Sequence, residues 1–120
     1  MLTTEEKIKI VVAALEDIKA SNITVIDTSK LSSMFERIVV ASANSPRQTR
    51  ALANHVVQQI KLRDAIVLST EGEDSGEWVL VDLGEVVVHI MQPAVRAYYR
   101  LEELWDKQYK PPTPPRHLAT

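Results

Sequence analysis

Glycine and proline divide this sequence into helix-forming and strand-forming parts, and their placement constrains the fold more than any other feature. All three glycines lie between residues 72 and 84, where they bracket one apolar segment. Pro46 and Pro93 each precede a helix-like stretch, where the missing backbone N–H costs nothing. The other four prolines fall within residues 111–115, so we expect the folded part of the chain to end before them.

Two helices are predicted from apolar side chains that recur with helical spacing and from the residues that precede them. The first spans residues 3–21, and Thr3 with Glu6 fits a capping box at its start. The second spans residues 45–63 and has Ser45 as its N-cap. A third helix begins at the last isolated proline, and its predicted apolar face consists of Ala94, Tyr98, Leu101 and Trp105.

Five short apolar or β-branched segments are typical of strands: residues 23–28, 35–43, 65–69, 77–83 and 85–92. The predicted order is therefore α-β-β-α-β-β-β-α, an α/β (α+β) fold with helices covering a mixed five-stranded sheet. The strand–helix–strand unit over residues 35–69 predicts parallel pairing at its right-handed crossover. The last two strands meet at Gly84, which predicts an antiparallel hairpin. We expect one domain over residues 1–105 and a mobile proline-rich tail over residues 106–120.

Composition excludes several classes of protein. The 120 residues contain no cysteine, which removes disulfides, thiolate metal sites and cysteine nucleophiles. A net charge of -2 gives no global field for holding a polyanion, so little direct nucleic-acid binding is expected. The polar, acidic start is unlike a signal peptide, and no apolar run reaches the ~20 residues of a membrane span. These features predict a soluble, cytoplasmic protein without a membrane partner.

Catalytic and metal motifs are weak in this chain. The glycines match neither dinucleotide nor phosphate-loop patterns, and the three histidines lack the spacing of metal ligands. We interpret His89 as a structural, hydrogen-bonded histidine, because it lies within an apolar strand. A serine triad of Ser42, His89 and Asp82 has no nucleophile elbow to support it. Asp27 and Asp82 could hold a divalent cation, but capping and backbone hydrogen bonds are favoured.

The strand over residues 77–83 is the most informative segment. Because side chains alternate across a sheet, Trp78, Leu80 and Asp82 share one face, and the other face is fully apolar. An exposed Trp beside an aliphatic residue and a carboxylate is typical of an interaction hot spot, whereas the alternative is that the last helix covers Trp78.

Two arginines begin the predicted helix over residues 45–63. Arg47 and Arg50, one turn apart, could bind carboxylate or phosphate, although solvated surface charge is the default interpretation.

Three segments together resemble the ribosomal silencing factor family, also called the iojap-like proteins. These are IVVASANSPRQ (residues 38–48), the Glu-Gly pair at residue 71 followed by WVLVDLGEVVVH (residues 78–89), and the segment from residue 96 to 105 that ends in YRLEELW. The resemblance covers about residues 5–105. Many members have Asp-Tyr-Phe in place of Glu36-Arg37-Ile38 and Asp in place of Glu85. Neither departure changes the assignment, and the second keeps the charge.

Membership of this family implies a function without catalysis. Its members bind ribosomal protein fourteen of the large subunit, block joining of the small subunit and lower translation when nutrients are scarce. The fold is implied to be nucleotidyltransferase-like, but the Gly-Ser and paired acidic residues of those enzymes are missing here. No cofactor or metal is expected. The residues carried over as partner contacts are Trp78, Leu80, Asp82 and Glu85, with Tyr99 as a weaker candidate.

Three alternatives stay open at this point. The same surface could serve assembly of the large subunit instead of silencing, and it could serve a homodimer, which relatives of this family suggest. The third alternative is a metal-dependent nucleotidyltransferase that uses Asp27 and Asp82.

Overall fold

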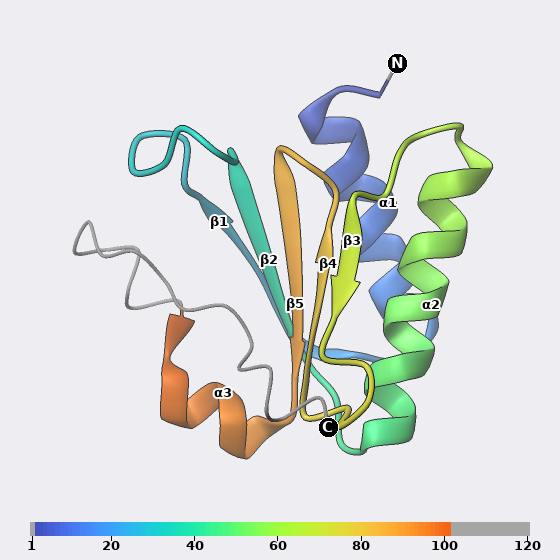
Figure 1. The fold of residues 1–120 in the computed structure, drawn as a ribbon, viewed down its shortest axis with the longest axis vertical. Helices are drawn as coiled ribbons and strands as arrows, with labels where there is room; N and C mark the ends of the chain where they lie inside the picture. The colour runs from blue at the N-terminus through green and yellow to red at the C-terminus, as the bar shows by residue number, and fades with distance from the viewer. Residues whose placement is uncertain (1, 102–120) are drawn as a thin grey trace.

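The computed structural model describes residues 2–101 and places one mixed sheet between two unequal helical layers (Figure 1). The elements are α1 (Thr4–Asp17), β1 (Ser21–Asp27), β2 (Arg37–Ser42), α2 (Pro46–Leu62), β3 (Ser69–Glu71), β4 (Trp78–Asp82), β5 (Val86–Met91) and α3 (Pro93–Tyr99). Helices α1 and α2 cover one face of the sheet, and α3 lies on the opposite side. The predicted element order and α+β class are confirmed. None of these helices is long and apolar enough to cross a membrane.

The strand order is β1-β2-β5-β4-β3, with β2 and β5 as the parallel pair and antiparallel pairing elsewhere. Parallel pairing between the two strands joined by α2 was therefore a wrong expectation. Those strands, β2 and β3, run in the same direction but are separated by the β4–β5 hairpin. The reason lies in β5, whose six residues are all buried, because such a strand needs neighbours on both sides and cover on both faces.

The strand expected over residues 65–69 is also corrected, because β3 begins only at Ser69. The helix before it ends at Leu62 with Arg63 as its C-cap, and Asp64 follows in a left-handed conformation with a φ of 58°. The following four residues are extended but form no ladder. Ala65 and Val67 pack against the helix-side core, and the Leu68 N–H donates to the carbonyl of Asp82, so packing and one hydrogen bond to β4 fix this connection.

Both predicted helix starts are confirmed in detail. Thr3 Oγ1 accepts a hydrogen bond from the backbone N–H of Glu6 at 3.1 Å, and the Glu6 carboxylate accepts one from the Thr3 N–H at 2.9 Å. Ser45 Oγ accepts the backbone N–H of Gln48 at 3.1 Å, with Pro46 at the first helical position. These caps satisfy backbone donors that the first turn of each helix leaves free.

The sheet separates two hydrophobic clusters because its side chains alternate between faces. The helix-side core joins α1 and α2 to residues of β2, β4 and β5, among them Val39, Val79 and Val88. The smaller cluster under α3 consists of Ile38, Val40, Trp78, Met91 and Leu101. Strand β2 contributes to both clusters, as its apolar run predicted.

Helix α3 is shorter than predicted, and its sheet-facing side differs. It ends at Tyr99, and Arg100 adopts a left-handed conformation with a φ of 48°. That reversal turns Leu101 into the core, whereas Ala94 and Tyr98 of the predicted apolar face are exposed. The side that meets the sheet includes Tyr99 instead. The fourth predicted residue, Trp105, and the tail over residues 106–120 lie outside the described residues.

Candidate functional site

Trp78 is the most deeply buried of the predicted contact residues. Its side chain is 1% exposed, and its ring centroid lies 4.8 Å from that of Tyr99. The indole Nε1 donates a hydrogen bond of 2.9 Å to Nδ1 of His89, which stands on the neighbouring strand β5. The last helical segment therefore covers Trp78, and this indole holds α3 to the sheet.

His89 is the buried, hydrogen-bonded histidine that the sequence predicted. An indole nitrogen can only donate, so Nδ1 of His89 is the acceptor and the proton of the neutral ring lies on Nε2. Burial lowers the pKa of His89 from 6.5 to about 4, because the charged ring would lose its hydration. The ring is neutral at pH 7 and acts as a fixed acceptor for Trp78.

Asp82 and Glu85 flank the turn of the β4–β5 hairpin. Asp82 Oδ1 accepts the N–H of Gly84 at 2.9 Å, which is the local hydrogen bond expected of this carboxylate. The Glu85 carboxylate forms an ion pair with Lys7 of α1, and Lys7 also donates to the carbonyl of Leu83 at 3.3 Å. Both carboxylates are half-buried, so they stabilise the turn and keep part of their surface in solvent.

The five predicted contact residues form two groups. Trp78 and Tyr99 lie at the start of β4, whereas Asp82 and Glu85 lie at its far end. Trp78 and Asp82 are four residue steps apart along β4, which separates the groups by about 13 Å at ~3.3 Å a step. Leu80 stands between them and is only 6% exposed. The accessible parts of the site are therefore the hairpin turn and the half-buried Tyr99.

The serine triad considered from the sequence is not assembled. Ser42 Oγ accepts a hydrogen bond of 2.9 Å from Arg96, the Nδ1 of His89 is bound to Trp78, and the Asp82 carboxylate accepts the N–H of Gly84. Each side chain thus has a structural partner other than a triad member.

Asp27 and Asp82 lie too far apart to share a cation. Strands β2 and β5 stand between their strands, which separates them by about 14 Å at ~4.8 Å a strand. The strand registers also place them on opposite faces of the sheet. The metal-dependent nucleotidyltransferase hypothesis based on this pair is therefore wrong. Among residues 2–101, no group of three metal-ligating side chains comes together.

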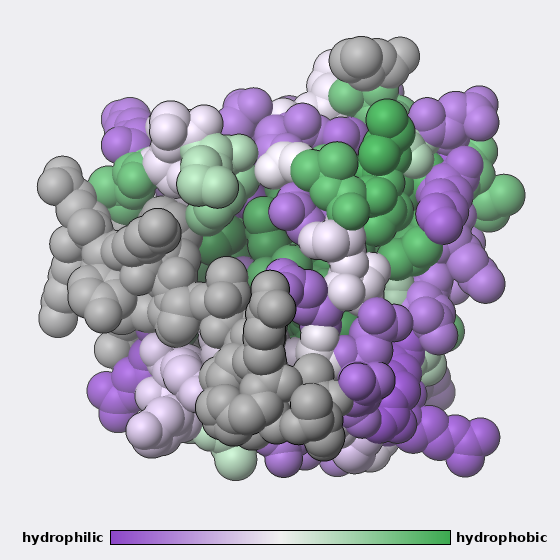
Figure 2. Space-filling view, viewed as in Figure 1, coloured by the Kyte–Doolittle hydropathy of each residue, from purple (hydrophilic) through white to green (hydrophobic). Residues whose placement is uncertain are grey.

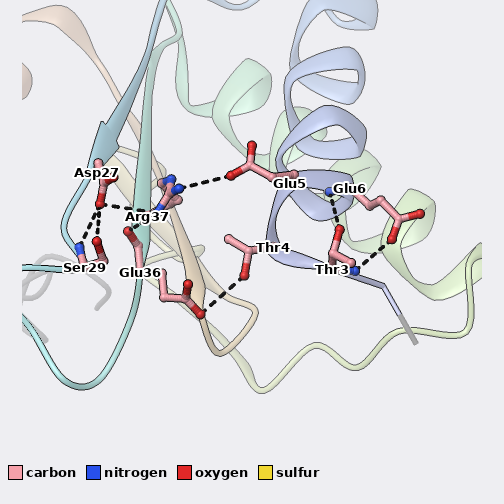
Figure 3. A network of polar contacts seen from close by, with 8 residues as sticks. All are labelled: Thr3, Thr4, Glu5, Glu6, Asp27, Ser29, Glu36 and Arg37. Atoms are coloured by element: carbon pink, nitrogen blue, oxygen red, sulfur yellow. Dashed lines mark hydrogen bonds and ion pairs between the residues drawn. The ribbon is translucent and has the colours of Figure 1, made fainter.

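Asp27 instead belongs to a polar network that joins β1 and β2 to the start of α1 (Figure 3). Its Oδ1 accepts the hydroxyl of Ser29 at 2.6 Å and the Ser29 N–H at 2.9 Å, and these bonds hold the pKa of the Asp27 carboxyl below its usual value. Arg37 lies 3.3 Å from Asp27 and 3.0 Å from the Glu5 carboxylate. Arg37 thus links α1 to the edge strand β1. Many members of the family have an aromatic residue at this position.

Two arginines have roles that the sequence did not indicate. Arg50 donates to the carbonyl oxygens of Glu73 and Asp74, both at 2.8 Å, so it holds the acidic loop onto α2. Arg96 donates to the carbonyl of Asn22 at 2.6 Å as well as to Ser42, and thereby ties α3 to the first two strands. The partners are 23 to 74 residues away in sequence, so no local pattern could have predicted them.

Comparison with known proteins identifies the family of this chain. A family model described as ribosomal silencing factor during starvation matches residues 1–119. The chain belongs to the ribosomal silencing factor family. A relative named ribosomal silencing factor RsfS from Chromobacterium violaceum is 55% identical over 106 residues, which cover 87% of this chain and 85% of that protein. The resemblance inferred from the three sequence segments is therefore confirmed.

A structural and a more distant relative extend the comparison. A crystal structure of a protein from Chromobacterium violaceum matches with a TM-score of 0.86 and 48% identity, covering 93% of this chain and 92% of that one. A mouse protein named mitochondrial assembly of ribosomal large subunit protein 1 is 32% identical over 101 residues, covering 82% of this chain and 44% of that protein. The family is thus one of ribosome-associated regulatory factors, and its fold is the one described above.

Proposed function

We propose that this protein binds the large ribosomal subunit through ribosomal protein fourteen and sterically blocks joining of the small subunit. Translation falls as a consequence when nutrients are limiting. Membership of the silencing factor family is the observation that carries this proposal. The described residues support a binding role, because their candidate catalytic groups have structural partners instead of one another.

The proposed contacts are the solvent-facing parts of Asp82, Glu85 and Tyr99. Trp78 and Leu80 lie beneath them, and they act by fixing the positions of β4 and α3. Carboxylates at the hairpin turn suit a basic ribosomal protein, because complementary charge steers association and selects the partner. The occluding mechanism needs occupied surface and no chemical step.

Co-sedimentation with separated ribosomal subunits tests the proposal. We expect the wild-type protein to pellet with large subunits and to stay in the supernatant with small subunits. Tyr99→Ala and Asp82→Asn should weaken pelleting. The control is Val25→Ala on the edge strand β1, because this side chain is 44% exposed and shares the α1 and α2 face of the sheet with its register partner Val39. Failure of the wild-type protein to bind large subunits contradicts the proposed function.

Assembly of the large subunit is the second candidate, because the mouse relative carries that activity in its name. Subunit-joining assays separate the two functions. A silencing factor lowers the yield of joined ribosomes from mature subunits, whereas an assembly factor leaves that yield unchanged. A homodimer through the same surface is a further proposal, and sedimentation equilibrium with and without large subunits tests whether self-association competes with binding.

A further inference from the structure

Two large apolar side chains are exposed in the segment that joins α2 to β3. Ile66 is 72% exposed and Leu68 is 63% exposed, while Ala65 and Val67 between and before them pack against the helix-side core. Figure 2 shows a hydrophobic area in the region of this segment and the neighbouring strands. A single exposed apolar side chain is ordinary, but two on the outer side of one segment, here Ile66 and Leu68, form an apolar anchor point.

This segment leads directly into the edge of the sheet. Strand β3 is last in the strand order and pairs only with β4 among the described elements. Half of the backbone N–H and C=O groups of an edge strand point away from its neighbour and can pair with a further strand. The apolar anchors and the unpaired backbone groups therefore lie one after the other along residues 66–71.

The charged residues within residues 64–85 have one sign, and Lys7 of α1 pairs with one of them, Glu85. Between residues 64 and 85 the chain has no lysine or arginine, and its acidic residues are Asp64, Glu71, Glu73, Asp74, Glu77, Asp82 and Glu85. Arg50 reaches this region, but it donates to carbonyl oxygens of the loop and not to its carboxylates. An extended segment with basic side chains fits such an edge, whereas RNA phosphates are repelled by it.

The edge is continuous with the hairpin turn of the proposed docking surface. The N–H of Leu68 donates to the carbonyl of Asp82 at 2.8 Å. A Cβ placed on Gly84 would lie 3.9 Å from Cδ1 of Leu68, so the leucine side chain borders the turn between Asp82 and Glu85. One partner can therefore contact the turn and the edge at once.

We infer that the β3 edge accepts an extended, basic segment of a large-subunit protein by strand addition, with Ile66 and Leu68 as its apolar anchors. This inference rests on the proposed function and adds the mode of recognition and two residues to it. A second copy of this chain is the weaker occupant, because two such edges would bring the same acidic groups together.

Binding variants test the anchors. Ile66→Asp and Leu68→Asp remove apolar contact without adding positive charge, and both sites are exposed, so the fold should persist in a circular-dichroism melt. We expect each variant to bind purified large subunits about 30-fold more weakly than wild type, as for hot-spot residues. Val25→Asp is the control, since this side chain is 44% exposed on β1, which is the strand at the other edge of the sheet. It should bind like wild type.

Cross-linking identifies the occupant. The chain has no cysteine, so Leu68→Cys carries a benzophenone maleimide at one defined position. With purified large subunits we expect an adduct to a protein segment rich in lysine or arginine. An adduct to ribosomal RNA or to a second copy of this chain overturns the inference. Wild-type affinity of both aspartate variants also overturns it while the proposed function stands, whereas absent binding of the wild-type protein removes both.

Discussion

The buried His89 makes the stability of this fold depend on pH in a defined window. The unfolded chain binds a proton at this imidazole below pH 6.5, but the folded chain does so only near pH 4. Between these values the unfolded state holds more protons, so the free energy of unfolding falls as the pH falls. From pH 7 to pH 5 the loss is about 2 kcal/mol, and at pH 4 and below it approaches about 3 kcal/mol. That is a large share of the ~5–15 kcal/mol typical of a domain.

Urea unfolding followed by circular dichroism at several pH values measures this effect. Glutamine at position 89 keeps an acceptor for the Trp78 N–H and does not titrate, so His89→Gln should have a flatter pH dependence between pH 6.5 and 4. The variant can be less stable than wild type at every pH, so the test compares how steeply the free energy of unfolding changes with pH in the two proteins. Equal slopes in the wild type and His89→Gln would refute the reasoning. The lowered pKa of Asp27 affects stability only at lower pH, because its ordinary value is already 3.8.

Three further outcomes follow from the packing and the helix starts. Gly72→Ala should lower the melting temperature strongly, because its Cβ would lie 2.0 Å from the backbone oxygen of Trp78, while Gly84→Ala meets only a side-chain atom at 3.9 Å and should cost less. Ser45→Ala removes the N-cap of α2 and should cost about 1 kcal/mol in urea unfolding, and no loss would contradict the capping role. Arg96→Met should speed hydrogen exchange in α3 while leaving α2 protected, since this arginine ties α3 to β1 and β2.

The fold was largely predictable because its signals are local. Thr3 and Ser45 cap their helices through residues three positions away, and the alternation of Val79 with Leu80 determines which face each meets. Strand order was not predictable in the same way. It depends on the β4–β5 hairpin inserting between β2 and β3, which is a contact between distant parts of the chain and leaves no local pattern.

The candidate site was harder to predict, and Trp78 shows why. A tryptophan on a strand face is compatible both with an exposed hot spot and with cover by a helix. The alternation of side chains along the strand is the same in either case. The turn at Arg100 decides between them, because it brings Leu101 over the sheet and sets Tyr99 against the indole. A left-handed arginine has no strong sequence signature, since glycine is the usual residue there.

The burial of Trp78 also changes how a binding experiment on this surface must be interpreted. Its replacement by alanine costs about 3–5 kcal/mol through lost packing and leaves His89 without its donor. Loss of ribosome binding in that variant therefore reports a displaced α3 as readily as a lost contact. Trp78→Phe retains an aromatic ring that can pack against Tyr99, but it removes the N–H together with the second ring of the indole. If Trp78 acts by holding α3, binding should follow the hydrogen-exchange protection of α3 across these variants, and not the presence of the indole.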